Sequence, residues 1–191
     1  MKTILLVSLF FLSTQAHCLT PFWVGFGSTT RNFSTAQNEN AGASTKFEFN
    51  PTLLVGANLP IDFLISGFTF VPAIGYAKYS SKDNASRNEI LLQYHISQEI
   101  ISSMLYLHYG LSNTITKVGG DGSTVKLNNG SSTTDFYAPS ESKTSYLASL
   151  DIAGEFIVLN EYGAKLQVSI DRFLSSKRRR VSHMFTLNYY F

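Results

Sequence analysis

The chain has 191 residues, of which 15% are charged and 14% are aromatic, and its formal net charge is +2. This length suits a single domain, and the charged fraction is below the roughly 25% of ordinary soluble domains. A net charge this small, on scattered basic residues, gives no indication of a nucleic-acid partner. The mean hydropathy is only +0.03. Beyond the N-terminus there is no uninterrupted apolar run of about 18 residues, which excludes a helical membrane protein.

The first segment, Met1–Cys18, has the features of a secretory signal peptide. Lys2 provides the positive start, Ile4–Leu12 is an apolar core, and the small residues Ala16 and Cys18 fit a cleavage site. A membrane anchor is the alternative, but this core is too short to span about 30 Å of hydrocarbon. Lipidation of Cys18 is another, although the residues before it match a lipoprotein box poorly. Cleavage after Cys18 leaves a mature domain, residues 19–191, without cysteine.

From residue 19 onward, apolar and polar side chains alternate in short runs separated by polar connectors. A period of two predicts β-strands with one apolar and one polar face. The side chains expected on the apolar face are Phe26, Leu53, Ile74, Leu92, Leu107, Leu150, Val168 and Leu187. Eight strands are expected, at Pro21–Thr29, Thr45–Gly56, Phe63–Tyr79, Arg87–Ser97, Ser103–Thr116, Thr144–Val158, Ala164–Phe173 and Val181–Phe191.

The connectors between these strands differ in length. Those after the second, fourth and sixth strands are short, whereas the others are polar and mostly longer. Bacterial barrels have this asymmetry, with short periplasmic turns and longer external loops. The longest connector, Lys117–Lys143, is expected to lack secondary structure. Loops of that length in a compact protein are usually functional or disordered.

Two irregularities interrupt the pattern. Pro51 and Pro72 fall inside expected strands, and a closed barrel has no free edge where a missing N–H donor is harmless. They are therefore expected at bulges or near a rim. The side chains of Phe63 and Ile65 are also out of phase with Phe68, which predicts a bulge or a late strand start near Ser66-Gly67.

The final strand, Val181–Phe191, ends on an aromatic residue, and apolar or aromatic side chains precede it at alternate positions. In this the chain resembles the small eight-stranded outer-membrane β-barrel proteins, such as OmpX and the membrane domain of OmpA. The resemblance implies an all-β fold, an eight-stranded antiparallel transmembrane barrel in an up-and-down meander, with both termini periplasmic. It also implies that the barrel-assembly machinery recognises Phe185, Leu187, Tyr189 and Phe191.

The same resemblance implies a location in the outer membrane of a Gram-negative bacterium, reached by secretion across the inner membrane. Stand-alone members of this class typically serve envelope integrity, surface adhesion or defence evasion. The expected function is therefore that of a non-enzymatic surface protein whose external loops, chiefly 117–143, contact a surface partner. A narrow pore is a further alternative, but eight strands enclose too little space for an aqueous channel.

An interior filled by side chains would contain charges of both signs. Buried charges are tolerable when they are paired, so a structural ion-pair network is expected, with a proton or ion pathway as the alternative. Aromatic girdles are expected at Phe22, Phe156, Tyr162, Tyr189 and Phe191 on the periplasmic side, and at Phe47, Tyr76, Tyr79 and Tyr146 on the outer side. The network is expected to contain Lys46, Glu48, Arg87, Glu89, His95, Asp151, Lys165, Asp171 and Arg180.

A lipid-modifying hydrolase is the rival hypothesis. His108 and Ser112 resemble the His-x-Ser of the lipid A deacylase family only loosely, because residues four apart on a strand are about 13 Å apart, too far for proton transfer. Both are also expected to face the lumen. His183 is expected to face lipid, but no acidic residue lies beside it on the same face of the strand. The four histidines are dispersed, so neither a metal site nor a cofactor is expected.

One basic cluster, Lys177–Arg180, would lie at the external rim. It is either a solvated loop or a contact for lipopolysaccharide phosphates, for which arginine is suited. The expected partners are therefore outer-membrane lipid and lipopolysaccharide, the barrel-assembly machinery during biogenesis, and a surface partner at the external loops.

Overall fold

The computed structural model describes residues 22–30, 49–61, 67–79, 85–128, 133–137, 140–159, 161–175 and 179–191. These residues form strands joined by turns and irregular segments. No helix among them is long and apolar enough to cross a membrane. The expected signal peptide, Met1–Cys18, lies outside the described residues.

The strands follow one another along the chain and differ widely in length. They are β1 (Phe22–Thr29), β2 (Pro51–Ala57), β3 (Leu59–Pro60), β4 (Phe68–Lys78), β5 (Ala85–Ile101), β6 (Leu105–Gly120), β7 (Thr124–Asn128), β8 (Thr133–Tyr137), β9 (Lys143–Val158), β10 (Tyr162–Asp171) and β11 (Arg180–Tyr190).

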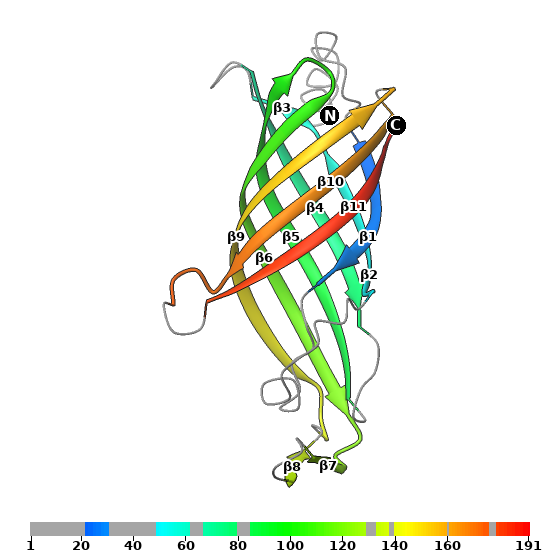
Figure 1. The fold of residues 1–191 in the computed structure, drawn as a ribbon, viewed down its shortest axis with the longest axis vertical. Coiled ribbons are helices and arrows are strands. Elements are labelled where there is room, and N and C mark those ends of the chain that lie inside the picture. The colour runs from blue at the N-terminus through cyan, green and yellow to red at the C-terminus, as the bar shows by residue number, and fades with distance from the viewer. Residues whose placement is uncertain are drawn as a thin grey trace, which may run out of the picture.

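The sheet closes upon itself as an antiparallel barrel (Figure 1). Sequence neighbours are hydrogen-bonded neighbours, β6 pairs with β9 around the β7–β8 hairpin, and β1 pairs with both β2 and β11. The backbone N–H of Phe191 donates to the carbonyl of Phe22, so the last residue lies beside the first strand. With β3 as a short continuation of β2, the barrel strands are β1, β2, β4, β5, β6, β9, β10 and β11, the expected eight-stranded meander.

The tilt of the strands follows from the pairing register. Starting at Phe156 of β9, cross-strand partners lead through Ala164, Leu187 and Phe26 to Leu53. The path continues through Tyr76, Ile90 and Ile115 and returns to β9 at Tyr146, ten residues from its start. A shear of ten over eight strands corresponds to a tilt of about 40°, from the usual rise and spacing of β-strands. A barrel of this size has an interior that side chains fill.

The alternation of side chains matches this geometry. Along β11 every second residue from Ser182 to Tyr190 is buried, and the residues between them are exposed. Of the residues expected on the apolar face, Phe26, Leu53, Ile74, Leu150 and Leu187 are exposed, and Leu92, Leu107 and Val168 are partly exposed. A buried apolar cluster around Trp23 fills one end of the lumen, with Leu54, Val71, Ala73, Tyr106, Ile157, Met184 and Tyr190.

Both prolines lie where a missing donor does least harm. Pro51 is the first residue of β2, a position that tolerates proline. Pro72 lies within β4 and is opposite Tyr94 of β5. On the other side of β4, pairing with β2 ends at Ala73 and pairing with β3 begins at Phe70, so the ladder is interrupted at Pro72.

The third strand starts at Phe68 and not at Phe63, which confirms the late start predicted near Ser66-Gly67. β4 begins at Phe68, directly after Gly67, whose positive φ of 80° belongs to a turn. Residues 62–66 lie outside the described residues. The connector after β2 is consequently longer than expected, and β3 within it pairs with the first residues of β4.

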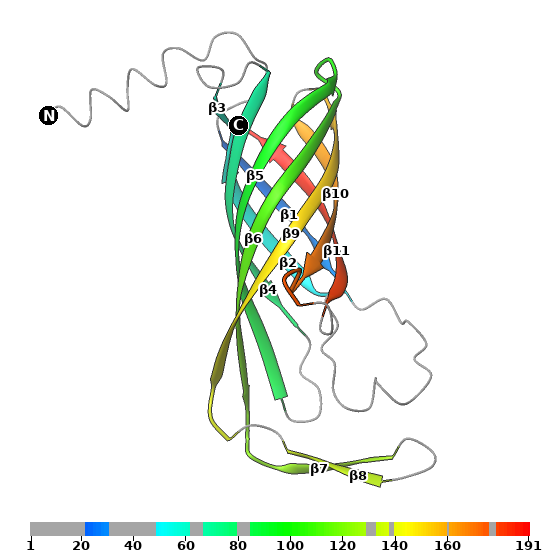
Figure 2. The same cartoon turned by 90° about the vertical axis from the view of Figure 1, so that its left-hand side faces the viewer.

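The expectation that Lys117–Lys143 lacks secondary structure is wrong. β6 continues to Gly120, β9 begins at Lys143 opposite Val118, and β7 and β8 form a hairpin between them. Thr is frequent in these strand ends, and the alternation of Val125 and Leu127 in β7 covers only five residues. A run this short does not distinguish a strand from a loop. The outer ends of β5, β6 and β9 (residues 85–87, 114–120 and 143–147), with β7 and β8, are called the extension here. Figure 2 shows the extension reaching far beyond the ends of the other strands.

Candidate functional site

Two parts of the molecule bear on function, the polar lumen and the extension. Of the expected lumen residues, Glu89, His95, Asp151, Lys165 and Asp171 are buried. Arg87 is partly exposed and Arg180 is exposed at the start of β11. Lys46 and Glu48 lie outside the described residues.

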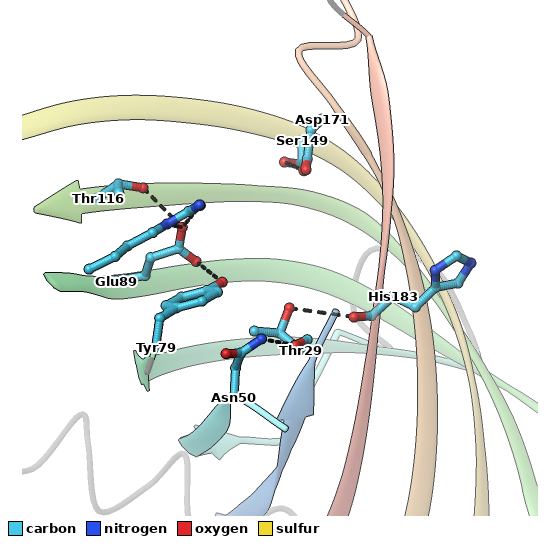
Figure 3. A network of polar contacts seen from close by, with 9 residues as sticks. Thr29, Asn50, Tyr79, Glu89, Thr116, Ser149, Asp171 and His183 are labelled. Carbon is cyan, nitrogen blue, oxygen red and sulfur yellow. Dashed lines mark hydrogen bonds and ion pairs between the residues drawn. The ribbon is translucent and has the colours of Figure 1, made fainter. Parts of the chain in front are cut away.

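Glu89 is the centre of a polar cluster near the end of the lumen from which the extension continues (Figure 3). Its carboxylate accepts hydrogen bonds from Thr116 Oγ1 at 3.0 Å and Tyr79 Oη at 2.8 Å, and it forms an ion pair with Arg87. The Arg87 guanidinium also lies 4.6 Å from the centroid of the Tyr79 ring. The cluster joins the ends of β4, β5 and β6 and satisfies a fully buried carboxylate.

The placement of Tyr79 in the outer aromatic girdle is therefore wrong. Its side chain is only 2% exposed and points to the lumen. The reason is its phase, because Tyr79 lies three residues after the outward-facing Tyr76 and so falls on the opposite face. Tyr76 and Tyr146 are exposed, as a girdle requires, and Phe47 lies outside the described residues.

Asp151 and His95 form a second buried pair across the lumen. His95 Nε2 lies 3.0 Å from Asp151 Oδ2, and the two residues come from β9 and β5, which are separated by β6. Two residues before His95 on β5, Gln93 Nε2 donates to Gln167 Oε1 at 3.2 Å, and Gln167 Nε2 donates to Ser169 Oγ at 3.1 Å. These contacts join β5, β9 and β10 through the interior.

Glu155 is the centre of a third cluster, which the expected network omitted. Its carboxylate accepts hydrogen bonds from Asn188 Nδ2 at 2.6 Å and from the Tyr190 hydroxyl, and it lies 2.9 Å from His108 Nε2. The alternation along β9 already places Glu155 on the inward face, so the sequence was sufficient to predict that it lies in the lumen. Its partners come from β6 and β11, and no local pattern identifies them.

Lys165 is buried beside this cluster. Its ammonium group lies 5.5 Å from the centroid of the Trp23 ring, a cation–π distance. The opposite charges that act on it are those of Glu155 and Asp151. In the described part of the chain, the Lys165 ammonium group forms no direct ion pair with either carboxylate. It therefore balances their negative charge at longer range.

Further polar contacts join neighbouring strands at the end of the lumen from which the extension continues (Figure 3). Ser149 Oγ donates to Asp171 Oδ1 at 2.6 Å, which joins β9 to β10. Asn50 Nδ2 donates to the carbonyl of Thr29, and Thr29 Oγ1 donates to the carbonyl of His183. These bonds link β1 to the start of β2 and to β11.

Among the described residues, no histidine contacts a serine side chain in the way that a hydrolase site requires. His108 Nε2 contacts Glu155, but Ser112 lies across from Ser149 and Gln93 on the neighbouring strands. The side chain of His183 is exposed on the outer face, opposite Val168 in the β10–β11 ladder. No group of three or more potential metal-binding side chains occurs in the ranges that the structure describes.

The residues of the expected assembly signal, Phe185, Leu187, Tyr189 and Phe191, are all exposed on the outer face. Tyr189 contacts Phe191 with ring centroids 5.1 Å apart and Tyr162 at 5.3 Å. Phe22 and Phe156, also expected in the periplasmic girdle, are exposed as well. Aromatic rings therefore gather at the end where the barrel strand β1 starts and β11 finishes.

The extension has an open sheet edge along β9. The ladder between β9 and β10 ends at Ser149 opposite Asp171, and Arg172 N–H donates to Ala148 O. Because backbone groups two residues apart in a strand point the same way, Tyr146 and Thr144 direct theirs toward this edge. Lys143–Tyr146 are exposed, and among the described residues only β6 pairs with them.

Comparison with known proteins gives similarity in structure but not in sequence. No family model matches the chain, and no curated sequence matches it. The chain is similar to the crystal structure of Ail, the attachment invasion locus protein of Yersinia pestis. The identity is 7%, 90% of this chain and 96% of that one are covered, and the TM-score is 0.49.

The chain is also similar to Neisserial surface protein A, with 11% identity, 89% and 97% coverage and a TM-score of 0.46. Ail in complex with the heparin analogue sucrose octasulfate matches with 9% identity, 90% and 96% coverage and a TM-score of 0.47. At these scores the fold is established by the ladders and burial of this chain itself. It is a closed, eight-stranded antiparallel β-barrel, the architecture of the small outer-membrane barrels that its last strand resembles.

Proposed function

We propose that the protein is a non-enzymatic β-barrel of a Gram-negative outer membrane that binds a surface partner through its extension. The membrane placement is supported by the outward faces of the barrel strands, which are apolar along their central length and end in aromatic rings on one side. Only closed barrels and helices satisfy all backbone groups in hydrocarbon. Cleavage of Met1–Cys18 on secretion is part of this proposal.

One observation favours a binding role most strongly, the open edge of β9. Exposed edges with unpaired N–H and C=O groups are templates for another strand. At this edge Thr144 and Tyr146 offer such groups, and the exposed Tyr146 side chain adds a contact. The partner that fits is an extended polypeptide segment, which would pair along the edge as an added strand. Adhesion and defence evasion are the roles that such binding would serve.

A first experiment removes the extension. Residues 115–146 are replaced by a short Gly-Ser turn that joins Thr114 to its cross-strand partner Leu147, which removes the open edge of β9 together with the β7–β8 hairpin. Bacteria displaying the protein are then tested for adhesion to epithelial cells and capture of serum proteins. We expect both to be lost, while heat-modifiable gel mobility shows that the shortened barrel still folds. Unchanged adhesion and capture by a folded deletion variant would refute the role of the extension.

A second experiment tests the edge itself. Thr144→Pro removes the N–H that faces the open side of β9, whereas Thr144→Ala keeps it, and neither change removes a β6–β9 hydrogen bond. The proline variant should lose most of the binding and the alanine variant should keep it. Equal binding by the two variants would show that strand addition at β9 is not the mode of recognition.

A lipid-modifying hydrolase remains the rival hypothesis, without a contact in the described residues that favours it. Incubation of the folded protein with lipid A or phospholipid, repeated with His108→Ala and His183→Ala, discriminates between the two. Product formation that either substitution abolishes would overturn the non-enzymatic proposal.

A further inference from the structure

We propose that the turn between β10 and β11 binds a phosphate group of lipopolysaccharide, with Arg172 and Arg179 as its ligands. This inference rests on the proposed placement in an outer membrane, but it is independent of the extension and its partner. It assigns a lipid contact to one side of the external rim.

Hydrogen bonds fix the described parts of this turn, residues 172–175 and Arg179. Arg172 has a positive φ of 54°, its N–H donates to the carbonyl of Ala148 at 3.0 Å, and its carbonyl accepts from Ser175 N–H at 2.8 Å. Arg179 Nη2 donates to the carbonyl of Phe173 at 3.1 Å. That bond holds the Arg179 guanidinium against the residue next to Arg172. Two arginines are thereby kept on one turn that is anchored to β9.

The charge around the turn has one sign. Between Asp171 and the end of the chain the sequence contains Arg172, Lys177 and Arg178–Arg180 and no acidic side chain. Asp171 itself is buried, and its carboxylate accepts the Ser149 hydroxyl. Arg172 and Arg179 are exposed. The two arginines are therefore exposed, and the segment that carries them contains no acidic side chain, which favours an anionic ligand.

The turn also lies where an apolar surface ends. Val181 on β11 and Leu174 in the turn are exposed, at 60% and 87%. Ile170 precedes the turn on the outward face of β10. The start of the turn contacts β9 through the bond from Arg172 to Ala148, and Figure 1 shows this start well short of the β7–β8 hairpin. Cations placed directly beyond an apolar band are at the depth of lipid head groups.

Phosphate is the anion that this geometry fits best, since a guanidinium group donates two parallel hydrogen bonds to it. In the proposed orientation the surrounding leaflet consists of lipopolysaccharide. Its acyl chains would contact the exposed apolar side chains, and its phosphate would lie between the two arginines. A general attraction to anionic phospholipid is the competing explanation, which the experiment separates.

The test measures the affinity of the folded full-length barrel, in neutral detergent, for lipid A and for lipid A without phosphates but with the same acyl chains. Arg172→Gln/Arg179→Gln is compared with Lys117→Gln/Lys143→Gln, which removes two exposed cations of the extension instead. We expect the arginine variant to lose on the order of tenfold in lipid A affinity or more. The lysine variant should bind like the wild type.

Two further variants keep the result interpretable. Arg172→Gln alone leaves the Arg179 bond to Phe173 intact and should still weaken binding, and Arg172→Lys should restore part of it. Equal affinity for both forms of lipid A, or an arginine variant that binds like the wild type, would overturn the phosphate site. Equal affinity for phosphatidylglycerol would overturn the assignment to lipopolysaccharide. Insertion of the folded wild type into lipid vesicles is measured separately, and failure to insert would overturn the membrane placement instead.

Discussion

At the scale of single residues, small side chains make room for large ones in the lumen. A Cβ atom at Gly56 would overlap the indole ring of Trp23, and one at Gly25 would come within 3.2 Å of it. Trp23 is 2% exposed and packs in the apolar cluster that fills one end of the lumen. On the outer face, by contrast, a Cβ at Gly154 would have nothing within 4 Å. Glycine is thus required at one position and dispensable at the other.

These two glycines provide a matched pair of substitutions. Gly56→Ala should destabilise the barrel by about 1–3 kcal/mol, because the Trp23 ring must move in a packed interior. Gly154→Ala should leave the stability nearly unchanged. Urea-induced unfolding in lipid vesicles, followed by tryptophan fluorescence, gives both values. Equal stability of the two variants would show that Trp23 is not packed against Gly56.

Glu155 is the buried carboxylate at the centre of one lumen cluster. Glu155→Leu would leave Tyr190, Asn188 and His108 without their acceptor and would leave the buried Lys165 charge without its neighbour. We expect a loss of about 3–5 kcal/mol, the usual effect of removing one member of a buried charged pair. Glu155→Gln keeps an acceptor oxygen and should lose less. The same unfolding assay checks this order, and a leucine variant as stable as the wild type would contradict it.

At the scale of elements, the sequence predicted the strand faces well and the strand ends poorly. Inside lipid the two faces of a strand meet different surroundings, so a period of two appears in the sequence. The β7–β8 hairpin has only five residues in each strand, too few for a period of two to be told from a loop. The lumen partners of Glu155 were also unpredictable, because they depend on the register across β6, β9 and β11. Tyr79 is different, since its phase alone already placed it inside.

β4 offers a prediction about proline in a closed sheet. Pro72→Ala should change the stability by less than about 1 kcal/mol, because the ladder on one side of β4 is already interrupted there. Ile74→Pro, two residues further, removes a donor where both β2 and β5 are paired. It should cost about 3 kcal/mol or prevent folding. Heat-modifiable mobility and urea unfolding distinguish these outcomes, and a tolerated Ile74→Pro would contradict the register.

At the scale of the whole molecule, one division of space explains most of the sequence. Outward side chains are mostly apolar, and inward side chains are mostly polar and bond to one another, apart from the apolar cluster around Trp23. Closure leaves no unpaired edge within the barrel. The shear of ten and the resulting tilt let strands of about ten residues cross an apolar layer. The extension is the exception, with strands that continue beyond the barrel and expose an edge. Binding is therefore expected there and structural support in the lumen.

The most direct measurement of this account uses spin labels at each position from Ser182 to Tyr190 in the protein reconstituted in lipid vesicles, with Cys18 replaced by serine. Accessibility to oxygen dissolved in the bilayer should alternate with a period of two along β11, high at residues such as Phe185 and Leu187 and low at Thr186 and Asn188. Uniform accessibility along the strand, or access of a water-soluble reagent to the odd positions, would contradict a barrel whose apolar face lies in lipid.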